Sequence, residues 1–231
     1  TSIEYLSTKG VIVGYGADDY QPERDISLAE FFKIILANYD FEPEEITRYT
    51  HPFEDIDNEN DWFAPYIEKA WEIGLLDKTT ELNPHKTITR VQALKYALNF
   101  MGIPMPKLIN ETQWTLNFPD VRFNAWYAPS ILYGVSYGLL EPLDTQNNYF
   151  RPFTNLTRGE ATELAYNMDT YLFGNGLIGT NIELENAIFD GELEHSIPHL
   201  DILIDVWDRM HDDYWQGSEI DETELIYDAV K

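Results

Sequence analysis

The 231-residue sequence contains no cysteine, and this single absence excludes disulfide bonds, thiol nucleophiles and cysteine-based metal sites. Basic residues are also scarce: 15 lysines and arginines stand against 41 acidic residues, giving a formal net charge of −26. A surface of this charge repels nucleic acid and anionic lipid headgroups, so we expect neither as a partner. An anionic ligand would need a local cluster of basic side chains.

Long apolar runs are missing as well. No stretch of about 18 apolar residues occurs, so the sequence predicts no membrane span. Thr1 opens the sequence without a basic and apolar leader, and we expect any export signal to lie outside it. The composition is nevertheless 44% hydrophobic and 14% aromatic, which is enough apolar surface for packed cores. A chain without cysteine fits an exported bacterial surface protein, although many cytosolic proteins share the property.

The strongest positive signal is an internal repeat. Residues 53–76 and 118–140 share a Phe-x-Asp opening, a tryptophan, an Ala-Pro pair and a closing Gly-Leu-Leu. A second half occurs three times, with a hydroxyl residue followed three positions later by Glu or Gln: Ser27 and Glu30, Thr89 and Gln92, Thr157 and Glu160. The sequence therefore contains three copies, the first of which begins too late to include the Phe-x-Asp segment.

Each copy predicts a helix, a loop and a second helix. Pro65 and Pro129 suit the first turn of a helix, and Gly74 and Gly138 end those helices. The hydroxyl and Glu/Gln pairs are capping boxes that begin the second helices. One helix pair of this size cannot bury its apolar faces alone, so three pairs should pack on one another. We predict an all-α fold of three helix-loop-helix repeats in a pseudo-threefold bundle, followed by a C-terminal helical segment.

The predicted organisation has six parts. These are repeat one at 1–50, repeat two at 51–103, a connector at 104–117, repeat three at 118–172, a linker at 173–198 and the helical segment at 199–231.

Over roughly three-quarters of the chain, these motifs resemble the S-layer homology family. The resemblance implies a pseudo-trimer of repeats with grooves between them, in which cell-wall polysaccharide, often pyruvylated, or a peptidoglycan-linked polymer is bound. It further implies an extracellular position at the bacterial cell surface or envelope, with no cofactor. On this basis we expect a non-covalent anchoring module and no enzyme activity in this chain.

In that family the binding arginine lies in a Thr-Arg-x-Glu box, which corresponds to Arg90 and Arg158 here. An arginine in the first turn of a capped helix would stand beside free N–H groups and the positive end of the helix dipole, where a pyruvyl carboxylate could bind. The alternative is that both arginines form surface ion pairs. Repeat one has Leu28 at this position, so we expect fewer than three competent grooves.

Four further residues are candidates for glycan binding. Gly14 and Tyr15 form the Gly-Tyr pair that the family often has after its first helix. Trp62 and Trp126 could stack on a sugar ring. Aromatic residues at repeat-equivalent positions more often pack in a core, and the sequence favours the core for both tryptophans.

The segment LDILIDVWDRMHDDYWQGSEIDETELIYDAVK, residues 200–231, resembles the helical lead-in of carboxyl-terminal processing (S41-type) serine peptidases. Those enzymes use a Ser-Lys pair that would lie beyond Lys231, so no catalytic residue is predicted here. The resemblance implies an envelope-tethered peptidase as the parent protein. Two alternatives stay open: the repeats are a scaffold that packs against neighbouring surface proteins, or they position or regulate the peptidase.

Two groups of possible metal ligands have weaker patterns. His195 and His199 have helical spacing, but Pro198 lies between them and no third ligand is suitably spaced. A run of alternating acids lacks the glycine that a calcium loop requires, so a solvated loop explains it better: Asp55, Asp57, Glu59 and Asp61. We predict no metal site.

Overall fold

The computed structural model describes residues 1–174 except 15–18, 40, 59, 105, 107–108, 110–114 and 144–145. Within these residues the fold is helical and contains no sheet, which confirms the all-α prediction. The elements are α1 (Ser2–Thr8), α2 (Leu28–Asn38), the short 3-10 helix η1 (Pro43–Glu45), α3 (Ala64–Glu72), α4 (Arg90–Phe100), α5 (Ala128–Ser136) and α6 (Arg158–Gly174). The predicted C-terminal segment, with His195 and His199, lies outside the described residues.

The helix boundaries follow the local signals in the sequence. α2 begins at a capping box, in which the Ser27 N–H donates to Glu30 at 2.9 Å and the Glu30 N–H donates to the Ser27 hydroxyl at 3.2 Å. α4 and α6 begin in the same way, and prolines occupy the first turns of α3 and α5. Gly74 and Gly138 follow α3 and α5 with φ of +72° and +67°, a conformation that favours glycine.

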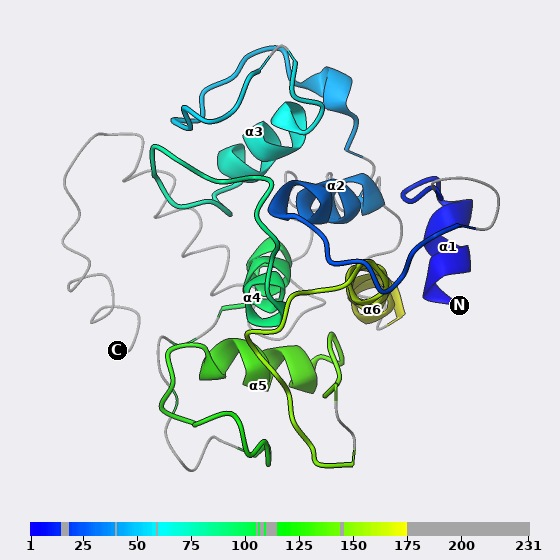
Figure 1. Cartoon of the computed structure of the whole chain (residues 1–231), viewed down its shortest axis with the longest axis vertical. Coiled ribbons are helices and arrows are strands. Elements are labelled where there is room, and N and C mark those ends of the chain that lie inside the picture. Colours follow the sequence, from blue (N-terminus) through cyan, green and yellow to red (C-terminus); the bar gives the residue numbers. More distant parts are fainter. Residues whose placement is uncertain are drawn as a thin grey trace, which may run out of the picture. The chain divides into compact units, whose positions relative to one another are not determined.

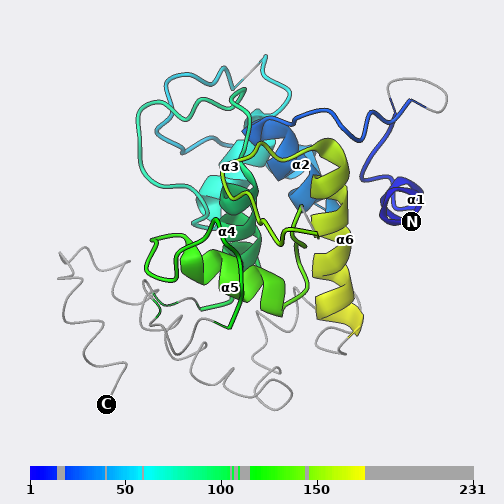
Figure 2. The same ribbon diagram turned by 60° about the horizontal axis from the view of Figure 1, so that its bottom comes forward.

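The long helices α2, α4 and α6 lie together, and the shorter α1, α3 and α5 lie around them (Figures 1 and 2). Each short helix packs on the long helix of a different repeat: α3 on α2, α5 on α4, and α1 on α6. The repeats therefore exchange helices around a ring, and the contact of α1 with α6 closes it. This arrangement explains why a single helix pair would leave apolar faces uncovered.

A ring of backbone hydrogen bonds joins the three repeats just before their long helices. The Ile26 N–H donates to Leu156, the Leu156 N–H to Ile88 and the Ile88 N–H to Ile26, at 3.1, 2.8 and 3.1 Å. All three side chains are buried. Each repeat thus donates one backbone hydrogen bond and accepts one, which is the pattern expected at a pseudo-threefold axis.

The structure also accounts for the aspartate of the Phe-x-Asp segment. Asp55 accepts the backbone N–H groups of Leu82 and Asn83 at 2.9 and 2.7 Å. Its equivalent in repeat three, Asp120, accepts those of Phe150 and Arg151 at 3.1 and 2.7 Å. Asn83 and Arg151 have φ of +58° and +56°, so each aspartate holds a turn in a conformation that non-glycine residues rarely adopt. Asp55 therefore has a structural role in the acidic run that resembled a calcium loop.

Where the ring closes, a buried polar network joins repeat one to repeat three. Asp169, only 3% exposed, accepts hydrogen bonds from Tyr5 (3.1 Å), Lys9 (3.1 Å) and Asn38 (2.8 Å). Burial raises the pKa of the Tyr5 hydroxyl, and the Asp169 carboxylate raises it further, to about 12. The network thus supplies partners for a carboxylate that would be costly to bury alone.

Candidate functional site

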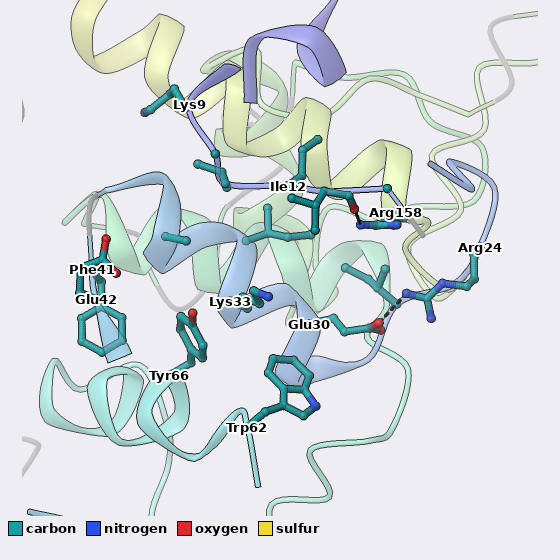
Figure 3. A pocket seen from close by; sticks show the side chains of 17 residues that line it. Lys9, Ile12, Arg24, Glu30, Lys33, Phe41, Glu42, Trp62, Tyr66 and Arg158 are labelled. Atoms are coloured by element: carbon teal, nitrogen blue, oxygen red, sulfur yellow. Dashed lines mark hydrogen bonds and ion pairs between the residues drawn. The ribbon is translucent and has the colours of Figure 1, made fainter. Parts of the chain in front are cut away.

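A groove of about 430 Å³ opens between the repeats along one face of α2 (Figure 3). We call it the inter-repeat groove. Its walls are the segment after α1, residues before, within and after α2, residues around the start of α3, and the first residue of α6. The lining residues are Lys9, Gly10, Val11, Ile12, Val13, Gly14, Arg24, Ile26, Glu30, Lys33, Ile34, Ala37, Phe41, Glu42, Trp62, Tyr66 and Arg158. Four of these are basic and two are acidic, which reverses the balance of the whole chain.

A lysine and an exposed tryptophan form the mouth of the groove. The Lys33 Nζ lies 5.4 Å from the centroid of the Trp62 ring, within cation–π range. Trp62 is 52% exposed and rests edge-on against the buried Phe63, with 5.4 Å between the ring centroids. The tryptophan is therefore fixed from beneath while much of its surface stays accessible, next to a positive charge.

Arg158 lies at the inner wall of the groove, where it ties repeat three to repeat one. Its Nη1 and Nη2 donate to the backbone carbonyls of Tyr20 and Val13 at 2.8 and 2.7 Å. The guanidinium also lies 4.3 Å from the Tyr20 ring centroid. These contacts hold the segment that carries Val13 and Gly14, and they bring a positive charge to the groove.

Arg24 and Glu30 form an ion pair on the groove wall (Figure 3). The other Glu30 oxygen accepts the Ser27 N–H of the capping box at 2.9 Å. Burial raises the pKa of the Glu30 carboxyl, but the hydrogen bonds from Arg24 and Ser27 outweigh it, so the pKa lies below its ordinary value. Glu30 is therefore charged at neutral pH.

The other predicted arginine, Arg90, has a more enclosed setting. Its side chain is 1% exposed and pairs with Glu160. Its Nε donates to the Phe150 carbonyl at 3.2 Å and its Nη2 to the Glu141 carbonyl at 2.5 Å. Burial lowers the pKa of this guanidinium, and Glu160 opposes the shift. Arg90 is thus a buried, paired cation, unlike the surface ion pair of the sequence alternative.

The expectation of free N–H groups beside these arginines was wrong. The Arg90 and Val91 N–H groups donate to backbone carbonyls of repeat three at 3.0 Å each. Those of Arg158 and Gly159 donate to carbonyls of repeat one at 2.8 and 2.7 Å. Sequence reasoning treated each helix start as an isolated terminus, whereas neighbouring repeats satisfy these donors. These four N–H groups are therefore not available to an anion.

The core assignment of the two tryptophans was also wrong, because Trp62 is 52% and Trp126 64% exposed. The residue after each one, Phe63 or Tyr127, takes the inner position instead and supports the indole edge-on. The structure brings Gly14, Trp62 and Arg158 to one groove, whereas Arg90 and Trp126 do not line it. Tyr15 lies outside the described residues.

Most of the groove residues were missed from the sequence, among them Arg24, Glu30 and Lys33. The repeat alignment carried a usable signal for Lys33, because repeat two has Lys95 at the equivalent position, while repeat three has Glu163. A basic residue repeated in so acidic a chain is informative. The same signal was present for Arg24, because repeat two has Lys86 at the equivalent position and repeat three has Thr154.

Parts of the sequence match a known protein family. Residues 1–32 and 117–162 match the S-layer homology domain, in segments that contain α1, the start of α2, α5 and the start of α6. Domains of this family anchor proteins to the cell surface, and they are not catalytic. The match supports the family assignment of the repeats and indicates a cell-surface or envelope-associated location.

Several known proteins are similar to this chain over part of its length. An amylopullulanase of Thermoanaerobacterium thermosulfurigenes is 26% identical over 170 residues, 72% of this chain and 9% of the relative. The exoglucanase XynX of Acetivibrio thermocellus is 25% identical over 170 residues, 72% of this chain and 15% of the relative. A surface-layer 125 kDa protein of Lysinibacillus sphaericus is 32% identical over 100 residues, 42% of this chain and 8% of the relative. The chain thus spans a small part of each of these relatives.

Two further features are absent from the described part of the chain. No helix there has the length and apolarity to cross a lipid bilayer. No group of three or more His, Asp or Glu residues there is arranged to hold a metal ion.

Proposed function

We propose that this chain is an anchoring module that binds an anionic cell-wall polysaccharide non-covalently in the inter-repeat groove. The observation that carries the proposal is the mouth of the groove, where Lys33 lies over the exposed ring of Trp62. A pyranose ring can stack on the indole, and an acidic substituent on that sugar can then pair with the lysine ammonium.

The inner wall supports the same ligand. Arg158 adds positive charge, and Gly14 leaves the wall without a side chain at that point. In a chain of net charge −26, an anion would be repelled from most of the surface. Clustering of basic groups around an aromatic platform therefore favours this groove over the remaining described surface as the place where an acidic glycan binds.

The remaining candidates receive different roles. Trp126 lies 64% exposed at the position equivalent to Trp62, and we propose it as a second stacking position. Arg90 would contact a glycan only after Glu160 had moved from it, because the side chain is 1% exposed in the described state. We therefore infer that the molecule has fewer than three equivalent glycan-binding grooves.

The polypeptide that this module anchors is a further part of the proposal. The enzymes among the relatives are much longer than this chain, and we infer that these repeats likewise serve a larger surface protein. The peptidase resemblance of residues 200–231 supplies one hypothesis for its activity. Sequencing the gene past the codon for Lys231 tests it: a Ser-Lys catalytic pair would support a peptidase, and a glycoside hydrolase domain would contradict it.

Co-sedimentation with purified cell walls tests the binding function. Walls that retain their anionic polysaccharide should bring down the protein, and walls stripped of it with hydrofluoric acid should not. Trp62→Ala should weaken binding roughly 2- to 10-fold, because stacking on an aromatic face contributes about 0.5–1.5 kcal/mol. Ile73→Ala, which removes another partly exposed apolar side chain away from the groove, is the matched control. Equal sedimentation with both kinds of wall would contradict the proposal.

A further inference from the structure

The short helix of each repeat is followed by the same turn. Each turn contains a glycine with positive φ: Gly10 (+79°), Gly74 (+72°) and Gly138 (+67°). The N–H of the next residue donates back to the helix, from Val11 to Leu6, from Leu75 to Ala70 and from Leu139 to Gly134, at 3.0, 2.9 and 2.8 Å. These matched turns make Val13, Asp77 and Glu141 equivalent, since each lies three residues after its glycine.

The side chain at this position does not belong to the core. Val13 is 69% exposed, and Asp77 and Glu141 are exposed as well. The two residues before it are apolar and buried in every repeat: Val11 and Ile12, Leu75 and Leu76, Leu139 and Leu140. Packing in the core therefore does not select the side chain at the third position, where repeats two and three have a carboxylate.

The backbone at this position has the same contact in repeats one and three. The Val13 carbonyl accepts the Arg158 Nη2 at 2.7 Å, and the Glu141 carbonyl accepts the Arg90 Nη2 at 2.5 Å. A main-chain carbonyl accepts this bond whatever side chain the residue has. The turn is thus held in the same way, while the side chain that it presents is apolar in one repeat and acidic in the other.

Val13 lines the inter-repeat groove on the segment after α1. Figure 3 shows Ile12, the residue before it, and Trp62 on opposite sides of α2, so this segment and the tryptophan border the groove from two sides. The groove already contains the carboxylates of Glu30 and Glu42, and an acidic residue at position 13 would add a third. The valine instead presents methyl groups that can contact the C–H groups of a sugar ring.

We propose that Val13 is a specificity-determining residue: it gives the inter-repeat groove an uncharged edge where repeats two and three have a carboxylate, and so lets this groove accept an acidic sugar. The inference rests on the proposed function for the class of ligand. A carboxylate at the same edge, like that of Asp77 or Glu141, would repel the acidic group of the ligand.

The first test isolates the charge at position 13. Val13→Asp and Val13→Asn have side chains of the same shape, and the equivalent Asp77 shows that an acidic residue is compatible with the turn. Titration calorimetry with purified, solubilised anionic wall polysaccharide at low ionic strength should show at least about fivefold weaker binding by Val13→Asp than by Val13→Asn, because like charges in contact repel even in water.

Thr47→Asp is the matched control, because it adds the same charge at an exposed position that does not line the groove. Its affinity should lie within about twofold of the wild type. Equal affinities of Val13→Asp and Val13→Asn would overturn the inference and leave the proposed function intact.

The second test measures selectivity with the same polysaccharide after its carboxylates have been reduced to alcohols. The wild type should prefer the acidic polymer, and Val13→Asp should lower that preference about fivefold or more, while Val13→Asn leaves it within about twofold. An unchanged preference in Val13→Asp would overturn the inference alone. If the wild type binds neither polymer, or binds both equally, the proposed function fails and the inference fails with it.

Discussion

At the scale of single residues, both arginines of the repeated box are buried, and each donates to two backbone carbonyls of another repeat. Arg158 also lines the inter-repeat groove, and Arg90 also pairs with Glu160. The sequence placed both correctly at the start of a capped helix. It could not place the guanidinium groups, because their partners come from loops of another repeat more than fifty residues away in the chain.

Arg90 should therefore matter for stability more than for binding. Arg90→Ala leaves Glu160 as a partly buried carboxylate without its cation, and we expect a loss of about 3–5 kcal/mol in the free energy of unfolding. Urea denaturation followed by circular dichroism measures it. Arg122→Ala, at an exposed position, should change that free energy by less than about 0.5 kcal/mol. Equal small effects of both substitutions would show that the buried pair does not support the fold.

At the scale of helices, the sequence predicts helix boundaries well but does not predict the contacts between helices. The capping boxes, the first-turn prolines and the helix-ending glycines act within a few residues, so the boundaries of α2, α3, α4 and α5 could be predicted. Which helix packs on which could not be predicted. Exchange of short helices between repeats gives each helix a similar apolar surface to cover, and periodicity alone does not distinguish one partner from another.

The closure of α1 onto α6 gives a prediction at this scale. The raised pKa of Tyr5, about 12, means that its protonated form is favoured in the folded state. Its contribution is fully present below the ordinary tyrosine pKa of about 10 and is lost as pH rises toward 12. We expect the free energy of unfolding to fall over this range in the wild type.

Tyr5→Phe provides the control for this titration. The variant lacks the hydroxyl that donates to Asp169, so it should be less stable at pH 8 and should lose less stability between pH 10 and 12. Urea melts at several pH values measure both quantities. The same alkaline decline in the two proteins would show that Tyr5 does not couple ring closure to pH.

At the scale of the whole molecule, charge governs the behaviour of the chain. A net charge of −26 makes the folded state repel itself, and screening relieves that repulsion. Raising NaCl from about 0.01 to 0.3 M should increase the melting temperature by several degrees, measured by scanning calorimetry. A melting temperature that falls over this range would mean that local ion pairs such as Arg90 with Glu160 outweigh the overall repulsion.

Because the chain as a whole is strongly acidic, a groove lined by basic residues points specifically to an anionic ligand. The sequence revealed the charge imbalance and the repeat, but it did not reveal that basic residues from repeats one and three line the same groove as a tryptophan from repeat two. That meeting depends on ring closure. Binding of an acidic glycan to this cluster is therefore the central claim about the function of the groove.

Titration of purified anionic wall polysaccharide into the wild type, Lys33→Ala and Lys78→Ala tests this claim most directly. Lys33 lies over Trp62 at the groove mouth, and Lys78 is an exposed lysine that does not line the groove. Loss of a charge-assisted contact costs about 1.5–3 kcal/mol, so Lys33→Ala should bind roughly 10- to 100-fold more weakly, and Lys78→Ala within about twofold of the wild type. Equal affinities for all three proteins would contradict the account.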